Sequence, residues 1–281
     1  MKTVKTVSEA REAVQTMRQE AGKIGFVPTM GYLHEGHLSL VRKSMEECGG
    51  TVVSIFVNPM QFGPSEDYAR YPRDAARDAD LLGKAGVDLL FMPAVEEMYE
   101  KKFFTSVEVS ELSRRFEGSL RPGHFKGVCT VVCKLFNIVS PDRAYFGWKD
   151  AQQLLIIKKM ARDLNIPVEI ISCPTSREDD GLAISSRNIY IPADRRRDAA
   201  ALYKGLSKVR DLIEQQGVRN TSVLEEEGKK TIRKYQGIEL QYFEIVDPED
   251  LSPVKEINGK VLVLGAVRID GVRLIDNMLV G

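Results

Sequence analysis

The sequence of 281 residues has no excess of charge of either sign. Lysine plus arginine number 40 and aspartate plus glutamate number 40, so the formal net charge is zero. Proteins whose main partner is DNA or RNA usually carry a basic patch, and this balance gives no support for that class. The balance still leaves room for a local basic pocket.

Long apolar runs and paired cysteines are also missing. No run approaches the length of about 20 residues that a membrane-spanning helix needs, and residues 1–4 lack the apolar core of a signal peptide. The four cysteines are scattered, without a Cys-x-x-Cys pair (Cys48, Cys129, Cys133 and Cys173). We therefore expect a cytoplasmic protein with reduced, buried thiols and with neither a membrane nor a nucleic acid as partner.

The residues that are present indicate an ordinary globular protein built around one stretch near the N-terminus. Hydrophobic residues make up 43% and charged residues 28%, which is close to average. The apolar run 24–27 has the length of a buried strand, and Pro28 and Gly31 then break it. Apolar residues return at helical spacing (Leu38, Val41 and Met45). The pattern predicts a strand, a tight loop and a helix that begins near Gly36 or His37.

Two of the three histidines, His34 and His37, lie where this helix is predicted to begin. The N–H groups at a helix N-terminus bind anions, and Gly36 between the histidines lets a ligand approach the backbone. Imidazoles can also donate to phosphate oxygens. A solvated turn with two incidental histidines is the alternative, and the strand–loop–helix context favours the phosphate site.

Strands alternate with helices through the first 175 residues. Further strands are predicted at 51–57, 87–92, 142–147 and 168–172, and helices at 8–20 (with Ser8 as N-cap), 71–84, 128–139 and 148–160. This order is typical of βαβ units and a parallel sheet. Ligands of such sheets bind beyond the carboxyl ends of the strands, where we expect His34, His37, Asn58 and Gln61. The prediction is an α/β protein with a Rossmann-like domain at 1–175.

The composition changes after Asn188. Charged helices are predicted at 192–216 and 222–236, and strands at 240–246, 260–267 and 272–275 with a turn at Asp270–Gly271. These elements predict a smaller α+β domain at 176–281. The polar loop 175–188, which contains Gly181, lies at the junction and is typical of active-site loops.

Four blocks of sequence resemble the pantoate–β-alanine ligase family, and they occur in the family's order. They cover residues 26–37, 54–62, 145–154 and 180–188. The His-x-Gly-His element at 34–37 alone is weak, because other nucleotidyltransferases carry relatives of it. The four blocks together are highly specific, and the resemblance covers nearly the whole chain.

The resemblance implies ATP-dependent condensation of (R)-pantoate with β-alanine to pantothenate. It implies a pantoyl-adenylate intermediate, release of AMP and pyrophosphate, and a homodimer whose C-terminal domain covers the site. Mg²⁺ is expected on chemical grounds, because it screens the charge of the triphosphate. Catalytic roles fall on His34, His37 and Lys149, with His37 as proton donor. Gln61 and Gln153 match the residues that hold pantoate, and Gln61 also matches the β-alanine site. The residues implied to bind ATP are Met30, Gly31, Tyr32, Leu33, His34, Glu35, Gly36, His37, Gly147, Trp148, Lys149, Asp150, Ser176, Ile184, Ser185, Ser186 and Arg187.

Some positions depart from the family pattern or stay open. Trp148, Ser176 and Ile184 replace residues that are common in relatives, and we expect an effect on ATP affinity rather than on chemistry. Asp150 either holds the ribose hydroxyls or caps the helix that follows. His124 is expected to be structural or a pocket wall. Asp74 and Asp78 are candidates for indirect contacts with Mg²⁺, but neither is assigned, because a helix rich in Asp and Arg is more often solvated.

Two other functions compete with the ligase. An enzyme that moves AMP onto a phosphate acceptor would share the His-x-Gly-His loop, but it would not need Gln61 and Gln153. Its product would be dinucleotide-like, whereas the ligase releases AMP. A catalytically silent nucleotide- or RNA-binding module is the second alternative, and the neutral charge and the intact polar loops argue against it.

Overall fold

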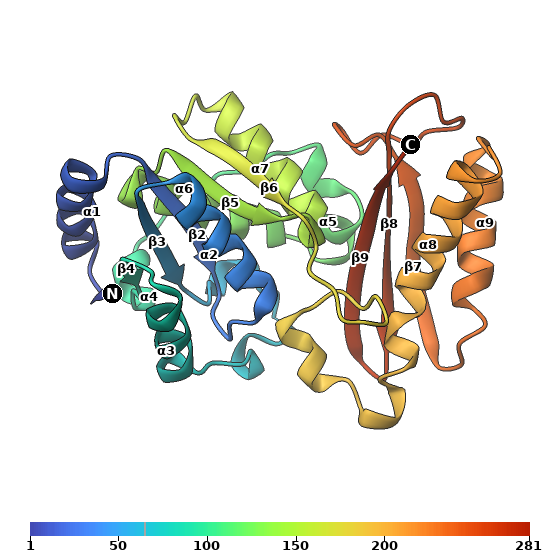
Figure 1. Ribbon diagram of the computed structural model, residues 1–281, viewed down its shortest axis with the longest axis horizontal. Helices are drawn as coiled ribbons and strands as arrows, with labels where there is room; N and C mark the ends of the chain where they lie inside the picture. Colours follow the sequence, from blue (N-terminus) through green and yellow to red (C-terminus); the bar gives the residue numbers. More distant parts are fainter. Residues whose placement is uncertain (65) are drawn as a thin grey trace. The chain divides into compact units, whose positions relative to one another are not determined.

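The computed structural model describes residues 1–64 and 66–281, which fall into two compact units (Figure 1). The first unit comprises Met1–Gly147 and Gln152–Pro174, and the second comprises Trp148–Ala151 and Thr175–Gly281. The long stretch of the second unit therefore begins one residue before the expected position, 176. The short segment Trp148–Ala151 groups with the second unit, which the sequence pattern did not indicate.

The first unit contains a six-stranded parallel sheet in the order β1-β4-β3-β2-β5-β6. The strands are β1 (Lys2–Val4), β2 (Ile24–Thr29), β3 (Gly50–Ile55), β4 (Leu89–Phe91), β5 (Arg143–Gly147) and β6 (Glu169–Cys173). The strand order reverses at β2, which pairs with β3 on one side and with β5 on the other. Ligands of open α/β sheets bind at such a switch point. The α/β class predicted from the sequence is confirmed.

Helices flank this sheet, so its central strands are buried on both faces. They are α1 (Val7–Ala21), α2 (Glu35–Glu47), α3 (Ala75–Ala85), α4 (Val95–Met98), α5 (Glu117–Leu120), α6 (His124–Val139) and α7 (Ala151–Asp163). Short 3₁₀ turns of this unit are η1 (Pro59–Gln61), η2 (Tyr68–Arg70) and η3 (Leu112–Arg114), whereas η4 (Trp148–Asp150) belongs to the second unit. Phe26, Val53 and Tyr145 are 0% exposed in the core.

Three details of the first unit differ from the sequence prediction. Thr6, not Ser8, caps α1, because the Thr6 hydroxyl accepts the Glu9 N–H at 3.2 Å and the Glu9 carboxylate accepts the Thr6 N–H at 3.0 Å. Helix α6 begins at His124, directly after Gly123, whose φ of 84° places it in the left-handed region. Strand β1 was missed, because its three residues depend on pairing with β4 rather than on a local pattern.

The second unit contains an antiparallel sheet of β7 (Ile238–Val246), β8 (Val261–Ile269) and β9 (Val272–Val280). Helices α8 (Ala201–Glu214) and α9 (Thr221–Ile232) lie along one face of it (Figure 1). The core between helices and sheet includes Leu206, Val209, Leu224, Phe243 and Val263. Asp270 and Gly271 have φ values of 44° and 85°, as a tight hairpin turn requires. The α+β pattern and this turn are confirmed.

The predicted helix 192–216 is wrong over its first part. That stretch forms the short turns η6 (Ala193–Arg195) and η7 (Asp198–Ala200) before α8, and η5 (Ser186–Tyr190) precedes them. Arg195 pairs with Asp198 and Asp270, and Arg196 pairs with Glu178 and Asp180. The partners Asp270, Glu178 and Asp180 lie outside the segment, and these pairs hold its chain in shorter turns.

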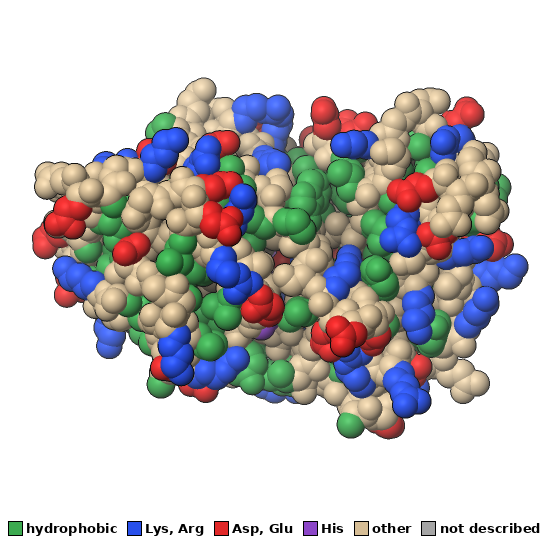
Figure 2. Space-filling model, viewed as in Figure 1, with side chains coloured by type: hydrophobic (Ala, Val, Ile, Leu, Met, Phe, Trp, Pro, Cys, Tyr) green, Lys and Arg blue, Asp and Glu red, His purple; other side chains and the backbone are tan. Residues whose placement is uncertain are grey.

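Among residues 1–64 and 66–281, no helix combines the length and hydropathy needed to cross a bilayer. On the face drawn in Figure 2, basic and acidic side chains are interspersed without a large field of one sign. This agrees with the balanced composition. The four cysteines are all among the described residues, and none of them forms a disulfide.

Candidate active site

The loop between β2 and α2 is held by a buried carboxylate. Asp78 of α3 is 1% exposed and accepts the backbone N–H of Tyr32 at 2.6 Å and that of Leu33 at 2.8 Å. Tyr32 has a φ of 50°, a region that residues other than glycine rarely adopt. Burial raises the pKa of Asp78, and the bonds from Leu33 and Tyr32 oppose that rise. The expectation of a solvated helix face is therefore wrong for Asp78, which fixes this loop.

Other contacts close around the same loop. The Gly31 N–H donates to the Thr29 hydroxyl at 3.1 Å, and a Cβ at Gly31 would meet Ile55 Cγ2 at 2.9 Å. Arg77 donates to the Leu33 carbonyl at 2.9 Å, and its guanidinium carbon lies 5.2 Å from the centre of the Tyr32 ring. The loop that bears several predicted ATP contacts is thus fixed from several directions.

The two histidines of the first motif lie against each other at the start of α2. His34 is the N-cap, and its backbone N–H lies 3.3 Å from His37 Nδ1. The ring centroids are 4.0 Å apart and the ring planes differ by 31°. Because Nδ1 of His37 accepts, a neutral His37 carries its proton on Nε2 and presents a donor there. The helix N-terminus adds further partial positive charge. Helix α2 begins at Glu35, one residue before Gly36, the earlier of the two predicted starts.

Asn58 and Gln61, after β3, connect to this loop through Met30. Asn58 is 1% exposed and donates to Gln61 Oε1 at 3.1 Å and to the Gly127 carbonyl at 3.1 Å, while Tyr99 donates to Asn58 Oδ1 at 2.8 Å. Gln61 Nε2 lies 3.1 Å from the Met30 sulfur. The Gln61 amide is therefore oriented with its oxygen toward Asn58.

Both ring nitrogens of His124 contact groups of the protein itself. Its Nδ1 lies 2.8 Å from the Gln61 carbonyl oxygen and its Nε2 lies 3.0 Å from Arg121 Nη1. A carbonyl only accepts and a guanidinium only donates, so Nδ1 carries the proton and Nε2 accepts. Burial and then Arg121 lower the pKa of His124 to about 4. Arg121 in turn pairs with Glu66.

Two adjacent glutamines at the start of α7 have different surroundings. Gln152 is 6% exposed, accepts from the Glu117 N–H at 3.1 Å, and donates to the carbonyls of Leu112 and Arg115 at 2.8 Å each. Its hydrogen-bonding groups are committed to the protein. Gln153, the residue that the family resemblance selects, is half-buried.

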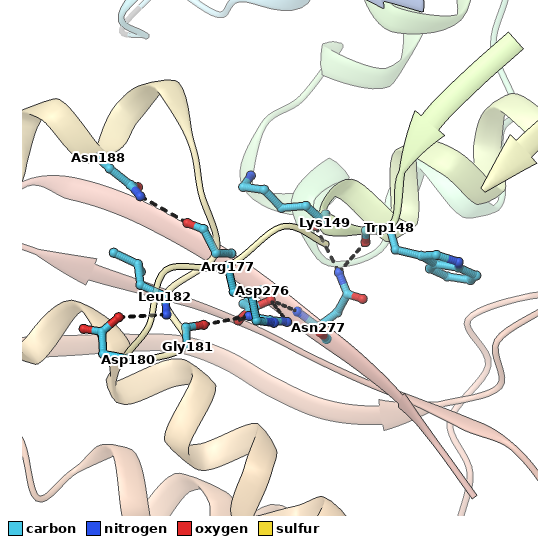
Figure 3. A network of polar contacts seen from close by, with 10 residues as sticks. Trp148, Lys149, Arg177, Asp180, Gly181, Leu182, Asn188, Asp276 and Asn277 are labelled. Atoms are coloured by element: carbon cyan, nitrogen blue, oxygen red, sulfur yellow. Dashed lines mark hydrogen bonds and ion pairs between the residues drawn. The ribbon is translucent and has the colours of Figure 1, made fainter. Parts of the chain in front are cut away.

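In the second unit, Lys149 lies in η4. Its amine is 3.5 Å from the Asp150 carboxylate, and its side chain is 20% exposed. The Asn277 amide of β9 donates to the carbonyls of Trp148 at 2.7 Å and Lys149 at 3.0 Å (Figure 3). The backbone of η4 is thereby fixed to β9.

The polar loop 175–188 forms a small hairpin within the second unit. The Ile184 N–H donates to the Ser176 carbonyl at 3.0 Å, and Arg177 pairs with Ala183. Gly181 turns the chain with a φ of 91°. The chain then enters η5, where the Ser185 hydroxyl accepts the Arg187 N–H at 3.3 Å.

The comparison with known families decides the identity. The family model for pantoate-beta-alanine ligase matches residues 2–279. The chain is 52% identical over 281 residues to the pantothenate synthetase of Thermotoga petrophila, with 100% of each chain covered. The chain belongs to the pantoate–β-alanine ligase family. It is a ligase of pantothenate biosynthesis that joins pantoate to β-alanine.

Other members of the pantoate–β-alanine ligase family are similar to this chain over nearly its whole length. The pantothenate synthetase of Caldicellulosiruptor saccharolyticus is 52% identical over 280 residues, covering 100% of this chain and 99% of the relative. The crystal structure of pantothenate synthetase from Thermus thermophilus superimposes with a TM-score of 0.94, 49% identity and 99% coverage of both chains. The pantoate-beta-alanine ligase of Francisella tularensis, complexed with beta-gamma ATP and β-alanine, gives a TM-score of 0.81 at 35% identity, covering 99% of this chain and 97% of that one.

Sequence reasoning on this ligase missed four polar residues that shape the candidate site. Asp78 occupies an Asp- and Arg-rich helix that looked solvated, and Arg177 lies among several charged residues of one loop. Asp276 and Asn277 interrupt the apolar pattern of the last strand, and both are 6% exposed. Two adjacent polar residues between the apolar pair Leu274–Ile275 and the apolar run Met278–Val280 are the one signal that would have drawn attention to them.

Proposed function

We propose that this ligase activates pantoate with ATP before β-alanine reacts. A pantoate carboxylate oxygen attacks the α-phosphorus, the bond from that phosphorus to the bridging oxygen of the β-phosphate breaks, and pyrophosphate leaves. The amine of β-alanine then attacks the acyl carbon of pantoyl adenylate, the carbon–oxygen bond to AMP breaks, and the nitrogen loses a proton. The products are pantothenate and AMP.

The stacked pair of His34 and His37 at the N-terminus of α2 carries this proposal. Negative charge builds up on the α-phosphoryl oxygens and on the departing pyrophosphate, and preorganised donors stabilise it. The Nε2–H group of His37 is such a donor, because the contact of Nδ1 with the His34 N–H fixes the ring. We assign His37 as the proton donor and His34 as its neighbour on the phosphates.

Residues of the second unit supply the remaining positive charge in this proposal. The Lys149 ammonium is a mobile point charge for phosphate, and the Arg187 guanidinium can bind phosphate oxygens in a bidentate manner. The hydroxyls of Ser185 and Ser186 add donors. The other ATP contacts implied by the family resemblance, including Asp150 at the ribose, remain predictions.

Gln61 and Gln153 are assigned to pantoate, and Gln61 also to β-alanine. Support comes from the orientation of the Gln61 amide, whose oxygen accepts from Asn58. Its nitrogen, which lies against the Met30 thioether, can donate to a substrate oxygen. Neighbouring Gln152 is unsuitable, because its amide already makes three hydrogen bonds to backbone groups.

Mg²⁺ is proposed as the partner of the triphosphate rather than of a protein cage. The part of the chain that the structure describes holds no group of three or more His, Cys, Asp or Glu side chains placed for a metal ion. Mg²⁺ is commonly bound by substrate phosphates and water, and there it would screen the charge of ATP. The homodimer and the cytoplasmic location stay predictions, and thiols without disulfides agree with a reducing compartment.

Exchange of labelled pyrophosphate into ATP tests the order of the two steps. We expect exchange to require pantoate and Mg²⁺ but not β-alanine, and the complete reaction to release AMP and pantothenate. Exchange that depends on β-alanine would contradict the adenylate order. A dinucleotide-like product would instead indicate transfer of AMP to a phosphate acceptor.

A further inference from the structure

Strand β9 carries two adjacent buried polar residues, Asp276 and Asn277, that the proposed mechanism does not use. Each is 6% exposed, and burial of polar groups is unfavourable unless hydrogen bonds compensate for it. Figure 3 shows that their partners belong to η4 and to the loop 175–188, the two segments of this unit that bear the proposed phosphate ligands.

Asn277 holds the backbone from which Lys149 projects. Its Nδ2 lies 2.7 Å from the Trp148 carbonyl oxygen and 3.0 Å from the Lys149 carbonyl oxygen. A side-chain amide nitrogen has two hydrogens, so both bonds can form at once. One side chain of β9 therefore binds two consecutive backbone carbonyls of η4.

Asp276 holds the polar loop through Arg177. The carboxylate accepts from Arg177 Nη1 at 2.6 Å and from Nη2 at 2.9 Å, a bidentate pair. The same two nitrogens donate to the Gly181 carbonyl at 3.0 Å and to the Asn277 carbonyl at 3.2 Å. The guanidinium carbon lies 4.6 Å from the centre of the Tyr203 ring. Arg177 is thus committed to the protein and fixes the hairpin that leads into Ser185–Arg187.

The two side chains lie on opposite faces of β9, because successive residues of a strand alternate. Asp276 pairs with Gly265, whose missing Cβ would meet Leu202 of α8 at 2.8 Å. Asp276 therefore faces the helices, where Arg177 contacts Tyr203 of α8, and Asn277 faces the other side. One strand connects both phosphate-binding segments through neighbouring residues.

We propose that Asp276 and Asn277 are positioning residues for the adenylation step. Asn277 sets the place of the Lys149 ammonium, and Asp276 sets the loop bearing Ser185, Ser186 and Arg187, so both segments keep a fixed separation along one triphosphate. The inference rests on the proposed roles of these phosphate ligands. Preorganised charge accelerates a reaction only where it is aimed correctly, and a misplacement of about 1 Å can lower a rate about 10²-fold.

The substitution Asn277→Asp tests this with little change of shape. It puts a carboxylate oxygen where the amide nitrogen donates, against two carbonyl oxygens. We expect kcat of pantoate-dependent pyrophosphate exchange to fall about 10²-fold, with KM for pantoate unchanged. The attack of β-alanine on supplied pantoyl adenylate needs no triphosphate, so its rate should stay within about threefold of the unmodified enzyme. A merely structural role would lower both half-reactions together.

Val267→Ala is the matched control. Val267 is fully buried in the core of the same sheet, outside the polar network. This variant should lower the melting temperature while leaving the ratio of the two half-reaction rates unchanged. If Asn277→Asp does not fold, Asn277→Ala removes the donors without adding charge and is measured in the same way.

A double-mutant cycle with Lys149→Ala decides whether Asn277 acts through Lys149. In the Lys149→Ala background, Asn277→Asp should lower exchange by less than about threefold, because contacting residues in one pathway are not additive. The proposal is overturned if the loss is about 10²-fold in both backgrounds, or if Asn277→Asp leaves exchange intact. Absence of pantoate-dependent exchange in the unmodified enzyme would instead reject the proposed function.

Discussion

Protonation of His124 should destabilise the first unit at mildly acidic pH. Both ring nitrogens are engaged, Nδ1 with the Gln61 carbonyl and Nε2 with Arg121. A proton on Nε2 would place an imidazolium against a guanidinium in a site where His124 is only 8% exposed. The neutral ring is therefore the form that fits the folded state.

The size of this effect follows from the pKa of His124. Burial and then Arg121 lower it from 6.5 to about 4, while Glu66 and Glu117 oppose the change. The unfolded chain binds the proton below about pH 6.5, and the folded protein binds it only near pH 4. The contribution of neutral His124 to the free energy of unfolding is therefore fully present above pH 6.5. It is lost as the pH falls from 6.5 through the folded pKa of about 4. The interval corresponds to about 3 kcal/mol.

Urea denaturation between about pH 8 and about pH 4 measures the loss. Other carboxyl groups also titrate in this range, so the variant His124→Asn serves as reference. Its amide N–H retains the bond to the Gln61 carbonyl, and it does not titrate. The free energy of unfolding of the unmodified protein should fall relative to that of the variant by about 3 kcal/mol across the range. Parallel curves would show that His124 is not held neutral by the fold.

Three substitutions test the remaining assignments. Asp78→Asn can accept only one of the two loop N–H groups, so the free energy of unfolding should fall by about 2 kcal/mol and KM for ATP should rise; unchanged values for both would remove Asp78 from the loop's support. His37→Ala should lower single-turnover adenylation by about 10²-fold at an unchanged melting temperature, and near-normal adenylation would remove His37 from the mechanism. Arg187→Ala should raise KM for ATP at least tenfold, the scale of about 1.5 kcal/mol for one charged hydrogen bond. KM for pantoate should stay the same, and an equal rise in both would contradict a phosphate contact.

Buried strands and the loops that follow them could be predicted from the sequence. Strands β2 and β3 are rich in apolar and β-branched residues because both of their faces are covered, and breakers mark their ends. The position of His34 and His37 at the start of a helix was predicted for a similar reason, since a strand–loop–helix pattern leaves only a short loop, whereas the contact between their rings was not predicted. Elements that depend on distant partners were not foreseen, as with β1, which exists through its pairing with β4.

The helix predicted at 192–216 failed for the same physical reason. Helix propensity and charge along the segment favour a continuous helix, but Arg195 and Arg196 bind acidic residues outside it. These pairs hold the chain in two short turns, η6 and η7, before α8 begins at Ala201. Tertiary contacts override local propensity here, and no local pattern reveals them.

Gln152 and Gln153 show which part of the site could not be predicted from residue type and spacing. The two residues are identical in type and adjacent on α7, where neighbouring positions point about 100° apart. Gln152 points at three backbone groups of residues 112–117, some forty positions earlier in the chain, and its amide is fully used by them. Gln153 points elsewhere and remains half-buried. Composition and spacing treat the two alike, and only the family resemblance selected Gln153. Which polar side chain serves a ligand depends on which backbone groups the fold places opposite its neighbours.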